Sequence, residues 1–492
     1  MGKQPMSRLA LIALLLPVAP CLAQTPFDEW ASTHQIMGHS IALQQGDEPI
    51  QLWTGGWRNW EDQLPVEPST VFRVASVSKS VTALGAMRLW SEGLLDLDAE
   101  VGTILEGLQP HGIVHPAHPD QAVTVRHLLT HTSGLRDGSG YSDFLASTYE
   151  GTTIPPISAL LSPDGNAYTP DMWSSDVPGT TFGYANVNYG LLATAMEAVS
   201  GMRFDELMTQ WVIEPLGLNA SFNIHDINDI NDVAVLYRHI NEWVPQADNY
   251  GGEWPPFVDL EGYTPGTNGL RFGPQGGLRC NAEDLLRLAR EWSAPLDGPE
   301  ELLPNPAVDT MRTVQWAYNG TNGNNYGGLF ELWGLGLHID GFPPLPGSLM
   351  WGHPGEAYGL LSGTYHVQTP DRCDFRFVYL LNGMQASPEL GLNGWYTVEN
   401  DLHDLFGNWA QTACNVSHVQ GPFDAARPTA WILQPGTNLP EALTVDTMRW
   451  MDLQGNVVTQ THPGEGVVPD LPAGRYFVMA HGEHATQVVI QR

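Results

Sequence analysis

A serine and a lysine three residues apart carry the first chemical signal in this sequence. Ser76 and Lys79 share one face of any helix that contains them, so the amine can reach the hydroxyl. Apart from Lys3, Lys79 is the only lysine, against nineteen arginines. A desolvated lysine can lose its proton near neutral pH, which arginine does not do. The pair is typical of a serine nucleophile activated by a neighbouring base, although such a pair also arises by chance.

Three further segments carry side chains that fit the same chemistry. Residues 124–135 end in His-Thr-Ser-Gly-Leu. Tyr184 and Asn186 stand two apart, which places both side chains on the same side of an extended segment. Residues 353–356 read His-Pro-Gly-Glu and precede a strand-like run over 360–367. The four segments together are much more specific than the Ser–Lys pair alone.

In this order and spacing, the segments resemble the serine β-lactamase-related family. That family contains class C β-lactamases, D-Ala-D-Ala carboxypeptidases and β-lactamase-like (family VIII) esterases. The resemblance covers roughly residues 28–412. It implies an α+β fold, with an antiparallel sheet flanked by helices and joined to a helical region. The G-x-S-x-G signature of the α/β-hydrolase esterases is absent from the sequence.

The resemblance implies a role for each residue of the first segments. Ser76 attacks a carbonyl carbon and forms an acyl-enzyme, which water then cleaves. Lys79 and Tyr184 share the proton transfers, and either can be the base because the two groups titrate together. Asn186 orients Lys79 and the substrate.

The fourth segment departs from the β-lactamase pattern. The resemblance implies that the backbone N–H groups of Glu356 and Ser76 form the oxyanion hole and that Gly355 lets the substrate approach closely. His353 and Pro354 replace a lysine and a threonine that help the lactamases bind a carboxylate. A mostly neutral histidine, a proline and a following carboxylate weaken anion recognition there. This combination argues against an efficient β-lactamase.

The sequence therefore predicts an exported serine hydrolase that acts through an acyl-enzyme on an ester or small amide. A D-Ala-D-Ala carboxypeptidase or D-amino-acid peptidase, a weak β-lactamase, and a catalytically idle secreted binding protein remain open. The expected partners are small esters, amides or peptidoglycan-like molecules, with no cofactor and no metal. The formal charge of −33 argues against binding of nucleic acid or anionic membranes.

Helical and alternating periodicities predict the elements that must position these side chains. Helices are expected over residues 77–92, 186–199, 282–292 and 398–411. Strands are expected over residues 41–53, 360–367 and 375–381. Gly55 and Gly56 predict a turn, Gly201 a helix end, and Asn281 an N-cap. The first helix begins directly after Ser76, so its dipole and free N–H groups favour a developing anion at that serine.

Both ends of the chain carry segments outside the hydrolase domain, which is expected to span residues 24–418. Residues 1–23 have basic residues before an apolar run and predict a secretory signal, hence a secreted or cell-surface protein. No other stretch is long and apolar enough to span a bilayer. Residues 419–492 contain short β-like runs and predict a small antiparallel β-sandwich. Its motifs at 452–458, 471–476 and 487–490 resemble a type IX secretion sorting domain, which implies the type IX machinery as a partner; a generic accessory domain is the alternative.

Three cysteines follow the signal segment: Cys280, Cys373 and Cys414. An odd number in an exported protein allows at most one internal disulfide. Cys373 and Cys414 are the predicted pair because both lie near the end of the main domain. Three unpaired thiols are the alternative.

Overall fold

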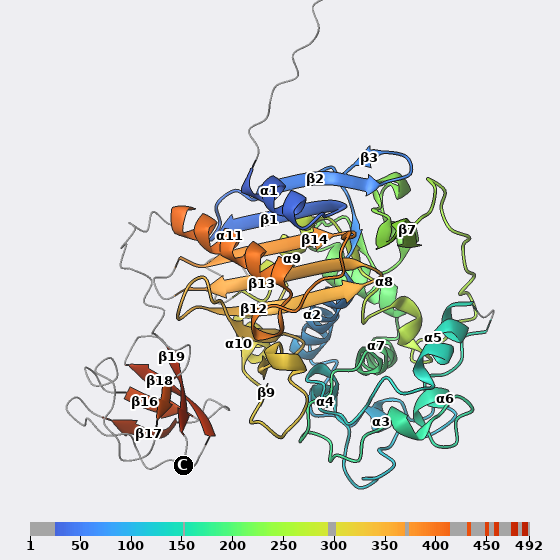
Figure 1. Cartoon of the computed structure of the whole chain (residues 1–492). Coiled ribbons are helices and arrows are strands. Elements are labelled where there is room, and N and C mark those ends of the chain that lie inside the picture. The colour runs from blue at the N-terminus through green and yellow to red at the C-terminus, as the bar shows by residue number, and fades with distance from the viewer. Residues whose placement is uncertain are drawn as a thin grey trace, which may run out of the picture.

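The computed structural model describes residues 25–150, 153–293, 302–369 and 373–413, together with five strands between 431 and 490. Within this part of the chain, a nine-stranded sheet has the order β3-β2-β1-β14-β13-β12-β11-β10-β9 (Figure 1). All neighbouring strands in it are antiparallel. The strands are β1 (Gly38–Gln45), β2 (Gln51–Asn59), β3 (Leu64–Pro65), β9 (Trp316–Ala317), β10 (Leu332–Trp333), β11 (His338–Gly341), β12 (Leu349–Ala357), β13 (Leu360–Gln368) and β14 (Phe375–Leu381).

Helices and short strands make up the rest of this domain. The helices are α1 (Pro26–Thr33), α2 (Ser78–Ser91), α3 (Val101–Ile104), α4 (Val125–Leu129), α5 (Tyr141–Glu150), α6 (Ser158–Leu161), α7 (Val187–Ser200), α8 (Phe204–Met208), α9 (Ala282–Arg290), α10 (Asn305–Arg312) and α11 (Thr397–Ala413). A three-stranded sheet joins β4 (Phe72–Arg73), β8 (Arg279–Cys280) and β5 (Ala220–Ser221). A hairpin joins β6 (Leu236–Ile240) and β7 (Glu242–Ala247).

Helices cover both faces of the nine-stranded sheet. On one face, Phe377 of β14 packs in a cluster with Phe27 of α1 and Phe406 of α11. On the other face, Val378 belongs to the large core cluster that includes Leu285 of α9. Successive residues of a strand point to opposite faces. Because both faces are covered, every residue of β14 is buried, and all but Arg376 are apolar or aromatic.

Helix α2 lies at the centre of the domain, between the sheet and α7 (Figure 1). Its residues from Ser78 to Met87 are all buried. The N-terminal end of α2 lies beside β12, because the turn that precedes the helix contacts that strand. The fold thereby brings the nucleophile segment against the His-Pro-Gly-Glu segment, 277 residues later in the chain as counted from Ser76 to His353.

The sequence predicted most of the elements around the site. The helices expected over 77–92, 186–199, 282–292 and 398–411 are α2, α7, α9 and α11, and the strands expected over 360–367 and 375–381 are β13 and β14. Asn281 caps α9 by accepting a hydrogen bond from the backbone N–H of Asp284. Gly201 ends α7 in the left-handed conformation, as the C-terminal glycine of a helix often does.

The single strand predicted over 41–53 is wrong. The segment is a hairpin of β1 and β2, with Gly46 at φ 48° in the turn. The turn predicted at Gly55 and Gly56 is also wrong, because both glycines lie inside β2. A Cβ on Gly56 would lie 2.2 Å from the carbonyl oxygen of Met37. The glycine here permits a close approach of two backbones inside a sheet.

The described C-terminal strands form a separate sheet in the order β15-β19-β18-β16-β17. They are β15 (Trp431–Leu433), β16 (Met448–Met451), β17 (Val457–Thr461), β18 (Gly474–Ala480) and β19 (Ala485–Ile490). β15 and β19 pair in parallel, unlike the antiparallel module that was predicted. These strands make one sheet, so the two-layer sandwich over 419–492 stays a prediction. The expected signal segment, residues 1–23, lies outside the described residues.

Two of the cysteines lie in the described part of the chain. Cys373 is disulfide-bonded, and Cys280 is a buried free thiol. Cys414 lies outside the described residues, so its pairing with Cys373 stays a prediction. Among the helices that the structure describes, none has the length and apolar character needed to cross a membrane.

Candidate active site

Ser76 lies in a single 3₁₀ turn, Ala75–Val77, that leads directly into α2. Ala75 has φ 44°, a left-handed conformation that costs energy in a residue with a side chain. The methyl group of Ala75 is buried in a cluster with Leu236 and Leu360, which holds the turn in place. The turn fixes Ser76 at the start of a helix, where free N–H groups and the dipole favour negative charge.

Lys79 follows one helical turn later and is completely buried. Its Nζ lies 3.0 Å from Ser76 Oγ, 2.9 Å from Asn186 Oδ1 and 2.8 Å from the carbonyl oxygen of Gln275. Burial lowers the pKa of Lys79 to about 7, and the negative charge of Asp137 opposes this shift. A substantial fraction of this amine is therefore neutral at physiological pH and can accept a proton.

Asp137 holds Asn186 in place at the start of α7. Its carboxylate accepts hydrogen bonds from the backbone N–H and the Nδ2 of Asn186, at 2.9 and 2.8 Å, and from the backbone N–H of Val187 at 2.9 Å. Asp137 thus caps α7 from another part of the chain. The amide of Asn186 is oriented with its Nδ2 toward Asp137 and its Oδ1 toward Lys79.

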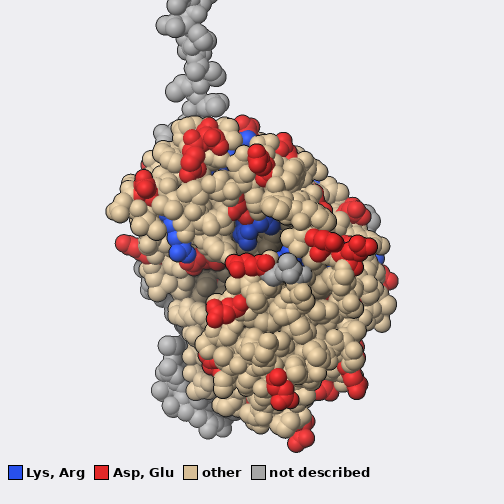
Figure 2. Space-filling view, turned by 90° about the vertical axis from the view of Figure 1, so that its right-hand side faces the viewer, with Lys and Arg blue, Asp and Glu red and all other residues tan. Residues whose placement is uncertain are grey.

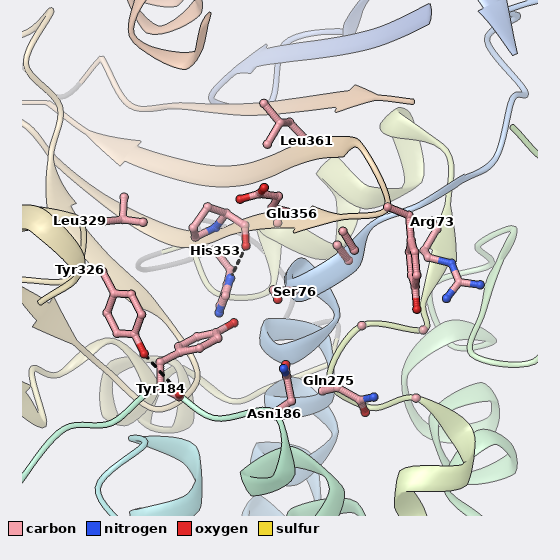
Figure 3. Close-up of a pocket in the computed structure, with 18 of the residues that line it drawn as sticks. Arg73, Ser76, Tyr184, Asn186, Gln275, Tyr326, Leu329, His353, Glu356 and Leu361 are labelled. Atoms are coloured by element: carbon pink, nitrogen blue, oxygen red, sulfur yellow. Dashed lines mark hydrogen bonds between the residues drawn. The ribbon is translucent and has the colours of Figure 1, made fainter. Parts of the chain in front are cut away.

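Tyr184 lies beside the amine and the nucleophile. Its ring centroid is 4.8 Å from Lys79 Nζ, and its hydroxyl points toward Ser76 (Figure 3). Burial raises the pKa of Tyr184 well above its ordinary value, and a hydrogen bond with Ser76 offsets part of that rise. The phenol is therefore protonated at neutral pH. It can donate a proton but does not serve as a resting base.

Aromatic side chains fix the position of the Tyr184 ring. It stacks on Phe330 with centroids 5.3 Å apart and packs against His131, tilted by 34°, with centroids 4.4 Å apart. His131 Nδ1 accepts a hydrogen bond from the backbone N–H of Ala185 at 3.3 Å. His131 thus supports the tyrosine segment and, among the described residues, forms no hydrogen bond with Ser76.

β12 forms the opposite wall of the site. Its pairing with β11 ends at Gly352. The residues of β12 that follow do not pair with β11, and the strand lies beside the Ala75–Val77 turn. A Cβ on Gly355 would lie 2.7 Å from the carbonyl oxygen of Val74 and 3.2 Å from the backbone nitrogen of Ser76. Only glycine allows this approach, which brings the predicted oxyanion-hole segments against each other.

His353 is buried and neutral. Burial holds its pKa well below the ordinary value, and the positive charge of Lys79 lowers it further. Its Nδ1 donates to the carbonyl oxygen of Pro354 at 2.5 Å, which leaves Nε2 as an acceptor (Figure 3). At this position the site therefore offers no cation for a substrate carboxylate.

A cavity of about 860 Å³ opens above Ser76. Six of the seven predicted site residues line it: Ser76, Tyr184, Asn186, His353, Gly355 and Glu356. The seventh, Lys79, lies beneath them and bonds to Ser76 and Asn186. The side chain of Glu356 also faces the cavity, where its carboxylate accepts a hydrogen bond from the Tyr396 hydroxyl at 2.8 Å.

Two contributors to the site had no signal in the sequence. Asp137 contacts Asn186 across 49 residues of chain, and the carbonyl oxygen of Gln275 contacts Lys79 across 196. Every residue type has a backbone carbonyl, so the sequence cannot indicate that the carbonyl of Gln275 is used. Tyr184 and Asn186 face Lys79 as expected, but Asn186 has helical dihedral angles rather than extended ones.

The chain matches a known family over most of its length. Residues 22–399 match the family model described as Beta-lactamase. Penicillin-binding protein 4* of Bacillus subtilis is 30% identical over 196 residues, which is 40% of this chain and 40% of that protein. Penicillin-binding protein 4 of Amycolatopsis lactamdurans is 25% identical over 348 residues, 69% of this chain and 80% of its own length.

Solved structures show the same fold. The octameric penicillin-binding protein homologue from Pyrococcus abyssi superposes with a TM-score of 0.55 at 23% identity, covering 94% of this chain and 88% of that one. EstCE1, a hydrolase with promiscuous acyltransferase activity, superposes with a TM-score of 0.55 at 23% identity, covering 76% of this chain and 96% of its own. The fold is the β-lactamase/transpeptidase fold, and the chain belongs to the Beta-lactamase family of serine hydrolases.

Proposed function

We propose that this protein hydrolyses an ester or a small amide through an acyl-enzyme on Ser76. The observation that carries the proposal is the buried Lys79 amine, 3.0 Å from Ser76 Oγ and with a pKa lowered to about 7. A base with a pKa near the working pH is the most effective one for proton transfer.

Each catalytic role follows from the surroundings of its group. Neutral Lys79 accepts the proton of Ser76 Oγ as that oxygen attacks the carbonyl carbon. The backbone N–H groups of Ser76 and Glu356 stabilise the oxyanion. Tyr184, protonated because burial raises its pKa, lies where it can pass a proton to the leaving group. Water then attacks the acyl group along the reverse path and frees Ser76.

The substrate wall favours a neutral leaving group over a β-lactam carboxylate. His353 is neutral, Pro354 has no N–H or hydroxyl to donate, and the Glu356 carboxylate faces the cavity. A substrate anion bound against this wall would therefore find no positive charge to pair with, and the Glu356 carboxylate would repel it. A β-lactamase is therefore the weakest of the hydrolase candidates.

A D-amino-acid peptidase is the second candidate. The D-aminopeptidase of Gluconobacter oxydans is 24% identical over 267 residues, and this chain matches 44% of that protein. The Glu356 carboxylate is a suitable partner for a free substrate amine. A catalytically idle binding protein is disfavoured, because every predicted site residue is present and the Ser76, Lys79 and Asn186 side chains are hydrogen-bonded together.

Turnover of three substrates distinguishes these candidates. We expect p-nitrophenyl butyrate to be cleaved faster than a D-Ala-D-Ala peptide, and nitrocefin to be the slowest. Ser76→Ala should abolish all turnover, whereas Ser69→Ala, an exposed serine seven residues earlier, should retain it. Full activity of Ser76→Ala would refute the proposal, and faster cleavage of the peptide would favour the second candidate.

Export is part of the proposed function and rests on the sequence. The basic and apolar run of residues 1–23 supports a secretory signal, and the motifs of 419–492 support type IX sorting. N-terminal sequencing of the mature protein from culture medium tests the first. The presence or removal of residues 419–492 in that protein tests the second.

A further inference from the structure

One wall of the cavity above Ser76 is basic, although the whole chain carries a charge of −33. Three arginines line it: Arg73, Arg271 and Arg279. Figure 2 shows the same contrast on one face of the molecule, where basic atoms lie inside a hollow and acidic side chains surround it. The carboxylates that line the cavity, Glu356 and Glu399, come from β12 and α11 on another side.

Two of the three arginines share a single carboxylate. Arg73 of β4 and Arg279 of β8 are directly paired residues of adjacent strands. In each arginine, Nε and Nη2 donate hydrogen bonds to the carboxylate oxygens of Asp248, at distances of 2.7–3.2 Å. Asp248 has no exposed side-chain surface. This group therefore keeps a net charge of +1 next to the cavity.

Arg271 is the guanidinium without an acidic partner. Within the part of the chain that the structure describes, it forms no ion pair, and its hydrogen bonds go to backbone carbonyl oxygens. Its Nη1 donates to the carbonyl oxygens of Thr148 and Tyr149, at 3.3 and 3.0 Å, and the guanidinium lies 5.5 Å from the Tyr149 ring. Asp205 is the carboxylate whose charge acts on Arg271, and it is itself hydrogen-bonded to Arg203. Backbone carbonyls thus hold the Arg271 guanidinium in place, and no carboxylate of the described residues neutralises its positive charge.

The basic wall includes Arg73, which lies across Ser76 from Tyr184. In Figure 3, Ser76 stands between Tyr184 on one side and Arg73 on the other. The charges of Arg73 and Arg271 both act on the Tyr149 hydroxyl, so the two arginines lie on the same side. The general acid must contact the leaving group, and the acyl group extends away from it. With Tyr184 as the proposed general acid, an acyl chain on Ser76 would extend toward the side of the arginines.

We propose that the acyl part of the substrate ends in a carboxylate and that Arg271 binds that carboxylate. The inference rests on the proposed hydrolase function and adds the chemical class of its acyl group, a dicarboxylic half-ester or half-amide. A guanidinium presents two parallel N–H donors that match the two oxygens of a carboxylate. The wall formed by residues 353–356 disfavours a negatively charged leaving group. The wall formed by the arginines favours a negatively charged acyl group.

Two esters that differ at one end test the inference. In the p-nitrophenyl half-ester of adipic acid, a carboxylate replaces the terminal methyl group of p-nitrophenyl hexanoate. We expect the intact protein to have the higher kcat/KM for the adipate ester. Arg271→Gln should lower the adipate-to-hexanoate ratio of kcat/KM by about ten-fold, since a charge-assisted pair is lost. The change should be in KM, because the carboxylate lies far from the reacting bond.

A matched variant separates this effect from a general loss of charge. Arg287→Gln removes an exposed arginine on α9 that pairs with Glu283 outside the cavity, and it should leave the ratio unchanged. A wild-type preference for hexanoate, or an unchanged ratio in Arg271→Gln, would overturn the inference while the hydrolase function stands. Absence of turnover of both esters would overturn the proposed function and this inference with it.

Discussion

At residue 79, the proposed mechanism requires a cation that can become neutral. Lysine meets this requirement, because complete burial lowers its pKa to about 7 while three acceptors hold the amine in place. Arginine stays charged in proteins and is also larger. Apart from Lys79, every lysine or arginine after residue 8 is an arginine, which is why this single lysine was informative.

Lys79→Arg is expected to lose at least about 100-fold in kcat/KM, because the variant keeps the positive charge but cannot accept the Ser76 proton. Ester turnover measures the loss. The melting temperature of the variant, compared with that of Lys79→Met, shows how much of any change is structural. Turnover near the wild-type level in a folded Lys79→Arg protein would contradict a role in proton transfer.

The pH profile should follow the protonation of Lys79. Its neutral form is the active one, so kcat/KM is expected to rise with pH up to a midpoint near 7 and to level off above it. Below the midpoint the rate should fall by about ten-fold per pH unit. A profile that is flat between pH 5 and 9, measured with a non-ionising ester, would be inconsistent with this assignment.

Among the elements, α7 depends on a cap supplied by a distant loop. Asp137 accepts two backbone N–H groups at the start of α7 and one side-chain N–H of Asn186. The same carboxylate raises the pKa of Lys79 against the effect of burial. One side chain therefore affects both the position of Asn186 and the protonation of Lys79.

Asp137→Asn should lower kcat/KM by about ten-fold, because a misplaced amide no longer holds Lys79 in line with Ser76. It should also move the midpoint of the pH profile to lower pH, since the charge that raises the Lys79 pKa is gone. Asp143→Asn, an exposed acid in the first turn of α5, is the control and should change neither. A fall in activity with no shift of the midpoint would show that Asp137 acts through geometry alone.

The elements show what the sequence could and could not predict. Local periodicity predicted α2, α7, α11 and β14, and the motifs predicted that Ser76, Lys79 and Tyr184 lie together at one site. The hairpin of β1 and β2 was missed, although Gly46, Asp47 and Pro49 between the two strands are typical turn residues. Asp137 and Arg271 were missed because their roles depend on contacts between distant parts of the chain, which periodicity does not report.

At the scale of the whole molecule, the described cavity residues come from residues 73–399. The C-terminal strands form a separate sheet and share no ladder with the nine-stranded one among the described residues. Helix α11, by contrast, covers a face of the main sheet with Leu402 and Phe406. The hydrolase domain therefore needs α11, and nothing in its described site needs the strands that follow.

A chain that ends at residue 418 is expected to keep kcat/KM within about two-fold of the full chain, as a domain with its own core should. It retains α11 and all four cysteines, so any disulfide of Cys373 is kept. A chain that ends at residue 396 lacks α11, exposes the apolar face of the sheet and should not fold. Inactivity of the 418-residue chain in a folded state would place part of the site in the C-terminal segment.

The most direct test of the central claim is the position of the covalent adduct. Incubation with a fluorophosphonate probe, followed by proteolysis and mass spectrometry, reports which side chain is phosphonylated. We predict a single adduct on Ser76, formed at a rate that rises with pH through 7, and no adduct in Ser76→Ala. An adduct on any other residue, or unchanged ester turnover by a protein in which Ser76 stays unlabelled, would contradict the account.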